Sequence, residues 1–449
     1  MAKTRRPSPG ATGSDHKDVE RNLERQIIAT PDDPGPYLVY ADWLQKQGDP
    51  RGQLIIAQHQ RSGAPANDEL RKLEARLLRK HRASLVPASL VELLARKPRN
   101  DDPDGRCELR WRLGFLSHVR LARREGPELH DVLGALLEHA SGRYLRALAI
   151  GPLDKGTQFD FAEVVDVLAE HQPRLLEAVV LGDGAGGIAG DGAGRLFELP
   201  ALKRLVSGVS LDIQRPTASS TLQELECRVP ASDATLTNLL TAKFDKLHTL
   251  VLTSPELGAA SLAALRTTDS LPTLCQLRLH DTIGKAAILP NLAVSPILRR
   301  LKVLAIQNSY ITDDEVEIIV RNAPRFGHLR HLELNGHGLT SDGVRRISKV
   351  CERVTVCRLT RSAIVTEDEI AALAPDDATR DAARAIADPR QWQRLVRNGD
   401  KIAGTHAAIE TEIELGRFGH RRCACHAPRP CMHILAALLI AASNDLPED

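Results

Sequence analysis

Leucines recur through the middle of the chain in the pattern Leu-x-x-Leu-x-Leu, in which isoleucine, valine or cysteine can replace a leucine. Each copy predicts a short strand, because apolar residues two apart face the same side of an extended chain. An amphipathic segment with helical spacing follows the strand, most clearly in LKVLAIQNSYITDDEVEII and LRHLELNGHGLTSDGVRRI. The predicted repeats begin at Leu116, Leu145, Leu176, Leu202, Leu222, Leu247, Leu274, Leu301, Leu329 and Val354, between 20 and 31 residues apart. Such units stack in one dimension, so we expect a parallel sheet over one continuous leucine core.

Residues 111–361 therefore resemble the leucine-rich repeat family, of the type whose strands alternate with helices. The resemblance implies an α/β fold, a leucine-rich-repeat solenoid of parallel strands plus helices, with a concave surface for a protein partner. The inward leucines include Leu329, Leu332 and Leu334, and Cys227 and Cys357 occupy inward strand positions as small buried hydrophobic residues. The array departs from the family where Asn usually bonds the loop backbone. That position holds Pro255, Thr282, Ser309 and His337.

One loop of the array imitates a nucleotide-binding motif. Gly182, Gly184 and Gly187 satisfy Gly-x-Gly-x-x-Gly after a predicted strand. A dinucleotide site also needs a long helix that opens on the last glycine and directs its amides at a pyrophosphate. More glycines and then Pro200 follow instead, so we interpret the segment as a repeat loop.

Helical patterns precede the repeats, in residues 17–110. The prolines in residues 31–36 end a first helix, Gly48 ends a second, and Asp49-Pro50 begins a third. Tyr40, Trp43 and Leu44 share one face of the middle helix. The segment LVYADWLQKQGDPRGQLI resembles the small bacterial repeat-companion domain found in front of leucine-rich repeats, which implies an architecture rather than an activity. Residues 66–97 continue as a helical connector with a break at Pro87, and residues 1–16 are predicted to be a disordered tail.

Residues 362–390 are rich in Ala and Asp and are predicted to be a linker. The part of the chain that follows contains three of the eight cysteines. IETEIEL alternates as a half-buried strand does. Cys423 and Cys425 are two apart and face the same way on an extended chain, and Cys431 and His433 stand where an apolar helix begins. Three sulfurs and one imidazole form a closed tetrahedral set, which favours a structural Zn²⁺.

Other interpretations of this cluster are weaker. His426 is a rival fourth ligand, but it adjoins Cys425 and would point away from it, and His420 is more distant. The other alternative is a surface thiol pair, with His433 only beginning a helix. Four soft ligands within eleven residues favour the metal site.

The segment RRCACHAPRPCMHILAALL resembles the SWIM zinc finger, in which Cys-x-Cys, a variable gap and Cys-x-His precede an apolar helix. The resemblance covers residues 391–443, predicts a small ββα-like zinc module followed by a tail at 444–449, and implies contacts to DNA or protein. Its nearby cations can also stabilise the thiolates. The candidate nucleic-acid contacts are Arg417, Arg421, Arg422 and Arg429.

Composition narrows the functions. A chain of 449 residues is long enough for two to four folding units. Its 60 Lys+Arg and 58 Asp+Glu leave a net charge of +2, so attraction to nucleic acid or membrane would need a local patch. Aromatic residues at 3% disfavour surfaces that stack single-stranded bases.

The N-terminal sequence lacks the apolar core of a secretory signal, and the longest apolar run, residues 434–442, is too short to cross a bilayer, which takes about 20 residues. We therefore expect a cytoplasmic protein with reduced thiols and no membrane contact. The resemblance to the repeat-companion domain implies a bacterial source. His-Glu-x-x-His, P-loop and Gly-x-Ser-x-Gly motifs are missing from the sequence. The sequence thus predicts a non-enzymatic, zinc-binding protein-interaction scaffold without a small-molecule substrate. The alternative is nucleic-acid binding, with DNA as partner of the zinc module.

Overall fold

The computed structural model describes residues 13–96, 107–122, 127–151, 161–182, 187–188, 192–214, 217–253, 255–280, 288–338, 341–350, 354–358, 374, 376–398, 401–407, 409–414, 421–423, 425 and 431–442. The chain divides into two compact units. Unit 1 contains Met1–Arg228 and Lys243–Lys246, and unit 2 contains Val229–Ala242 and Leu247–Asp449. Among the described residues, no helix is both long and apolar enough to cross a membrane.

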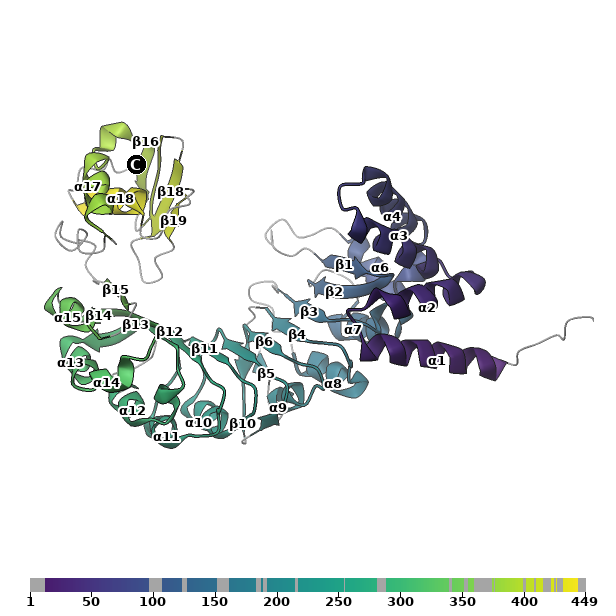
Figure 1. Ribbon diagram of the computed structural model, residues 1–449, viewed down its shortest axis with the longest axis horizontal. Coiled ribbons are helices and arrows are strands. Elements are labelled where there is room, and N and C mark those ends of the chain that lie inside the picture. Colours follow the sequence, from purple (N-terminus) through teal and green to yellow (C-terminus); the bar gives the residue numbers. More distant parts are fainter. Residues whose placement is uncertain are drawn as a thin grey trace, which may run out of the picture. The chain divides into compact units, whose positions relative to one another are not determined.

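Six helices open unit 1: α1 Gly13–Ala29, α2 Pro34–Lys46, α3 Arg51–Gly63, α4 Asp68–Lys80, α5 Arg82–Leu85 and α6 Ala88–Ala95 (Figure 1). The predicted boundaries hold. The Asp33 carboxylate accepts the N–H of Gly35 at 2.9 Å, and Asp49 accepts the N–H of Arg51 at 2.8 Å. Helix α6 begins after Pro87 as expected. Helix α1 starts at Gly13, inside the segment predicted to be disordered, and the rest of that segment and the C-terminal tail lie outside the described residues.

An aromatic cluster packs helix α2 against a β-hairpin that the sequence did not predict. Strands β1 (Glu108–Arg112) and β2 (Phe115–Leu121) pair antiparallel around a turn at Leu113 and Gly114, whose φ values are 47° and 80°. The rings of Phe115 and Tyr144 lie 4.5 Å apart edge to face, and those of Phe115 and Tyr40 are stacked at 6.0 Å. Helix and hairpin therefore share one core.

The strands that follow in unit 1 run parallel to β2 and alternate with helices. They are β3 Ala147–Ile150, β4 Ala178–Leu181, β6 Arg204–Ser207 and β9 Glu224–Cys227, in the order β2-β3-β4-β6-β9. Helices α7 Leu129–Glu138, α8 Phe161–His171 and α9 Gly192–Phe197 lie between them in sequence, with the 3-10 turn η1 Ala140–Gly142 after α7. Two short parallel pairs form separate two-stranded sheets: β5 Gly187–Ile188 with β7 Ser210–Leu211, and β8 Ala218–Ser219 with β10 Lys243–Phe244. The six-residue α9 is too short for a dinucleotide site, in keeping with our interpretation of the glycine-rich loop.

Unit 2 repeats the alternation. Its strands β11 Thr249–Thr253, β12 Gln276–His280, β13 Val303–Thr312, β14 His331–Gly338 and β15 Val354–Arg358 are all parallel. Its helices α10 Asp233–Thr241, α11 Ala259–Thr267, α12 Ile288–Val294, α13 Asp313–Arg321, α14 Ala323–Phe326 and α15 Ser341–Ile347 form a row beside the strands (Figure 1). The 3-10 turn η2 Ile297–Arg299 follows α12.

The strand register aligns the predicted apolar positions. Leu250, Leu277, Leu304 and Leu332 stand opposite one another in β11 to β14, and each is buried. Leu329 and Leu334 are also buried, and Cys227 is only 6% exposed, as predicted for an inward thiol. Burial raises the pKa of Cys227 to about 12, so it behaves as a neutral hydrophobic residue.

The predicted start of the last repeat at Val354 is wrong. In the register of β14 and β15, Val354 pairs with Leu332 and Val356 with Leu334, whereas Cys357 pairs with Asn335. Val354 is therefore the second apolar position of its repeat and not the first. This three-residue shift aligns Cys357 with Asn335 and not with the buried leucines of β14.

Neighbouring helices in unit 2 are joined by a side-chain cap. The carboxylate of Asp233, in the first turn of α10, accepts the backbone N–H groups of Gly258, Ala260 and Ser261 at 3.0, 3.3 and 2.9 Å. These groups form the start of α11. Burial raises the pKa of Asp233, but these hydrogen bonds outweigh that effect and lower the pKa below its ordinary value. Asp233 thus caps a helix one repeat further along the chain.

Candidate metal centre

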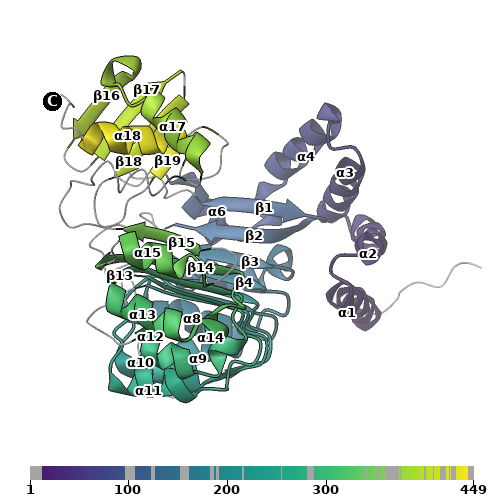
Figure 2. The same cartoon turned by 60° about the vertical axis from the view of Figure 1, so that its left-hand side comes forward.

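The C-terminal part of unit 2 is a four-stranded antiparallel sheet with two helices. The strands β16 Gln393–Asn398, β17 Lys401–His406, β18 Ile409–Glu414 and β19 Arg421–Cys423 lie in sequence order, after α17 Asp377–Ala385 and the short turn η3 Pro389–Gln391. Helix α18, Met432–Ala442, crosses the sheet and contacts β17, β18 and β19 (Figure 2). The predicted strand IETEIEL and the apolar helix are present. The unit is larger than the predicted ββα arrangement.

The core of this C-terminal module also draws on the segment predicted to be a linker. Helix α17 packs against α18, and Ala383 is buried among the apolar residues of α18. Trp392 is 6% exposed in the same core, and its indole N–H donates to the carbonyl of Ile386 at 2.7 Å. The packed module therefore includes α17 and begins before residue 391.

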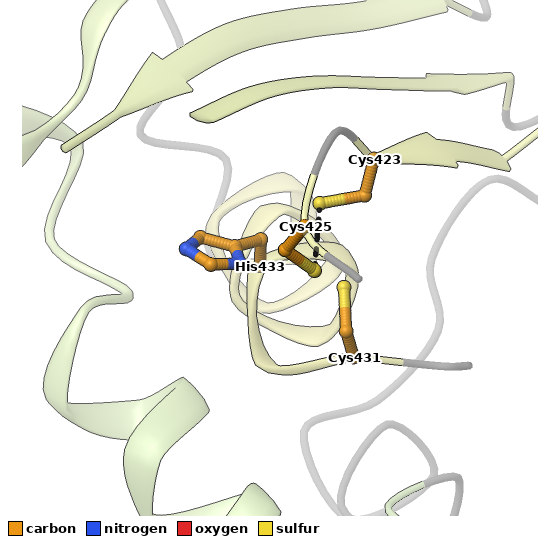
Figure 3. A group of neighbouring side chains, drawn as sticks. All are labelled: Cys423, Cys425, Cys431 and His433. Carbon is orange, nitrogen blue, oxygen red and sulfur yellow. Dashed lines mark hydrogen bonds between the residues drawn. The ribbon is translucent and has the colours of Figure 1, made fainter. Parts of the chain in front are cut away.

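The four predicted ligands come together at the junction of β19 and α18. Cys423 ends β19, Cys425 follows two residues later, Cys431 directly precedes α18 and His433 is its second residue. One donor atom from each residue lies within 4.8 Å of each of the others (Figure 3). Cys423, Cys431 and His433 are buried, at 6%, 1% and 2% exposure, and Cys425 is half-buried. Cys423, Cys425, Cys431 and His433 could therefore hold a metal ion.

Local structure explains how the sulfurs converge. Cys423 stands opposite Thr411 in the pairing of β18 with β19, and the Thr411 hydroxyl donates to its sulfur at 3.5 Å. The sulfurs of Cys423 and Cys425 are 3.2 Å apart. Cys431 precedes the first turn of α18, and its carbonyl accepts the N–H of Leu435 at 3.1 Å. A helix start favours negative charge, which would help to stabilise a thiolate at Cys431 once a metal ion had displaced its proton.

The two ends of the cluster differ in electrostatic character. Burial opposes ionisation of Cys423, but hydrogen bonds from the Thr411 hydroxyl and from the backbone N–H of Cys425 outweigh it and lower its pKa. Burial raises the pKa of Cys431 to about 12. A bound cation would reverse that effect, because a coordinating thiol loses its proton. The thiol of Cys423 therefore ionises more readily than an ordinary cysteine thiol, whereas the thiol of Cys431 needs a bound metal ion to lose its proton.

The imidazole is in the form that binds metals. Burial, together with the neighbouring His406, lowers the pKa of His433, so the ring is neutral at pH 7. Its Nδ1 atom is buried and has no hydrogen-bond partner among the described residues. Figure 3 shows the ring beside the three thiols. A buried nitrogen without a partner, next to three sulfurs, fits a metal ligand.

Two rings near His433 were not predicted as part of the site. The ring centroid of Trp392 lies 6.5 Å from that of His433, and the ring of His406 lies 5.7 Å from it. Thr411, the donor to Cys423, was also missed. These residues are 12 to 41 positions from the ligands they contact, and only the strand pairing and helix packing bring them close.

The predicted nucleic-acid contacts are only partly described. Arg421 and Arg422 lie in β19, opposite Ile413 and Glu412 of β18. Arg417 and Arg429 lie outside the described residues, as do the rival ligands His420 and His426.

Comparisons with known proteins leave the family open. No family model and no curated protein matches the chain. Among solved structures, it is similar to a protein from Bacteroides fragilis determined as a structural genomics target, with a TM-score of 0.39 and 17% identity. The alignment covers 50% of this chain and 68% of that protein.

Proposed function

We propose that the protein is a non-enzymatic, zinc-binding interaction scaffold, in which a leucine-rich-repeat array precedes a SWIM-type zinc module. The observation that carries the proposal is the convergence of three sulfurs and one imidazole, all donor atoms within 4.8 Å of one another. Thiolate and imidazole donors select zinc among the common divalent ions of the cell. A cytosolic location suits the site, because its thiols must stay reduced.

The donor set supports a structural role for the zinc. Catalytic zinc sites in proteins usually keep one coordination position for water or substrate, whereas a Cys3His set fills all four. Three of the four ligands are at most 6% exposed, which leaves little room for a substrate to approach. The metal would hold the end of β19 to the start of α18.

The strands supply the surface for a protein partner. Along β11 and β12 the residues alternate between buried and half-exposed, and the half-exposed set mixes apolar and polar side chains. It consists of Thr249, Val251, Thr253, Gln276, Arg278 and His280. Such a mixture is ordinary for interfaces between proteins.

Zinc stoichiometry tests the proposal directly. Native mass spectrometry of the full chain, expressed in zinc-replete medium, should find one zinc per chain, and acid release should return the metal. Replacing His433 with Ala should reduce the retained zinc, whereas His248→Ala, at a histidine remote from the cluster in sequence, should not. A metal-free wild-type chain would contradict the proposal.

A second function, nucleic-acid binding by the zinc module, is favoured by its charge. Residues 390–433 contain eight Lys/Arg against four acidic residues. Fluorescence anisotropy with a labelled DNA duplex at low salt tests it, since phosphate contacts weaken steeply as salt rises. Replacing Arg417, Arg421, Arg422 and Arg429 together with Gln should abolish the binding. No binding at low salt, or affinity independent of salt, would contradict this second function.

A further inference from the structure

A pocket of about 420 Å³ lies in unit 1, away from the metal centre in sequence. Helix α1 contributes Arg21 and Arg25, the segment after η1 contributes Arg143 and Tyr144, and the segment after α8 contributes Arg174. A pocket of this volume is within the usual range for small-molecule sites, about 300–1,000 Å³.

The pocket is rich in positive charge. Four arginines line it, against one acidic residue, Glu24. Arg143 is neutralised, because it pairs with Glu24 and with Glu20 at 3.2 Å. Arg174 has no ion pair or hydrogen bond within the described part of the chain, and Arg25 donates only to the carbonyl of Arg21 at 3.3 Å. Two guanidinium groups at the pocket thus lack an acidic partner.

A buried hydroxyl at the same pocket also lacks a partner. Tyr144 is only 3% exposed, and its hydroxyl forms no hydrogen bond to any described residue. Burial raises the pKa of Tyr144, so the hydroxyl keeps its proton and can donate. A buried donor without an acceptor is unfavourable, and a ligand oxygen would satisfy it.

The rest of the lining gives the pocket shape and an apolar wall. Gln172 has a φ of 43°, a conformation that is uncommon outside glycine and that turns the chain directly after α8. The turn brings Pro173 and Arg174 to the pocket. Ile28 and Leu137 form an apolar part of the wall.

We propose that this pocket binds a small organic phosphate. Arg25 and Arg174 pair with the phosphate, the Tyr144 hydroxyl donates to one of its oxygens, and the organic part lies against Ile28 and Leu137. Guanidinium groups match the geometry and charge of phosphate. Two guanidinium groups together with a neutral donor suit a dianionic phosphate ligand better than a ligand with a single carboxylate. The site is independent of the zinc proposal, so either can fail without the other.

Isothermal titration of the full chain with ADP, pyrophosphate and adenosine tests the proposal. ADP and pyrophosphate should bind saturably with one site per chain, and adenosine should bind much more weakly. The double charge reversal R25E/R174E should weaken the binding of both ADP and pyrophosphate by at least about tenfold, since charged hydrogen bonds contribute most of the attraction. Tyr144→Phe keeps the buried ring and removes only the hydroxyl, so it should lower the affinity for ADP and for pyrophosphate by about fivefold.

The matched control is Arg266→Glu, at an exposed arginine of α11 in unit 2. It makes a charge reversal of the same kind at a position that does not line the pocket, and it should leave both affinities unchanged. Three results would each overturn the proposal: no saturable binding of either phosphate, an equal loss in the R266E control, or unchanged affinities in Tyr144→Phe.

Discussion

Replacing Cys431 with Ser should unfold the C-terminal module and leave the repeats of unit 2 folded. Cys431 is 1% exposed, and its sulfur belongs to the cluster that joins β19 to α18. The serine hydroxyl is nearly the same size as the thiol, but it does not ionise at neutral pH to form a soft metal ligand. The substitution therefore removes one metal bond with little change in packing.

The expected magnitude follows from the small core of the module. Its large buried side chains are Trp392, Ile434, Leu435, Leu438 and Ile440, and the other buried members are alanines and the two ligand cysteines. The core of so small a unit rarely supplies more than about 3–5 kcal/mol. Structural zinc contributes about 10–16 kcal/mol of apparent binding free energy at pH 7. The metal therefore contributes most of the stability of the module, and the few large side chains of the core are too little to keep it folded when the site is broken.

Trp392 reports the unfolding. Comparing the emission of each variant with that of its W392F counterpart isolates this indole from the other two tryptophans of the chain. In Cys431→Ser the Trp392 emission should shift to longer wavelength at 25 °C, and calorimetry should retain the transition of the repeats. The control is Cys275→Ser, at a half-buried cysteine outside the cluster, which should change neither signal. A Cys431→Ser protein that kept native Trp392 emission would refute the reasoning.

Four further predictions concern the repeats and the N-terminal helices. Asp233→Ala should cost about 1–2 kcal/mol in urea unfolding, the usual value of a helix cap. Gly258→Ala should cost a similar amount in the wild type but little in Asp233→Ala, because a Cβ at Gly258 would lie 2.5 Å from the Asp233 carboxylate. Since the pKa of Asp233 is lowered in the folded state, its stabilisation should be complete above about pH 4 and disappear as the pH falls further, which thermal unfolding of wild type and Asp233→Asn between pH 2 and 7 would show. Arg51→Ala should cost about 3 kcal/mol in urea unfolding, because it leaves the carboxylate of Asp49 without its guanidinium partner in a largely buried site.

The sequence predicted what short-range patterns determine. The repeats could be predicted because the pattern Leu-x-x-Leu-x-Leu spans only six residues. The strand pairing then places Leu250, Leu277 and Leu304 in register. The four candidate ligands were found because they lie within eleven residues and their spacing follows the geometry of a strand end and a helix start. The error in the repeat start at Val354 arose where valines and cysteines replaced leucines, so that two alternative registers matched the pattern equally well.

Long-range contacts were not predictable in the same way. The hairpin of β1 and β2 depends on the turn at Leu113 and Gly114, and its packing against Tyr40 joins residues some 75 positions apart. The strands β16 and β17 lack a strong apolar alternation, and the sheet identifies them only by pairing them with β18. Trp392 and His406 reach His433 by the same pairing. No local pattern carries that information, because strand order is a property of the folded chain.

The position of the metal cluster bears on where a partner could bind. Its ligands come from a strand end and a helix start, and the most buried of them, Cys431, is 1% exposed. Three of the four ligands are therefore shielded from a macromolecular partner, and only Cys425 is half-buried. A bound zinc would act through stability, because it would hold helix α18 to the end of β19. Loss of partner binding on metal removal would thus report unfolding, and only substitutions that leave the zinc in place can map the contact surface.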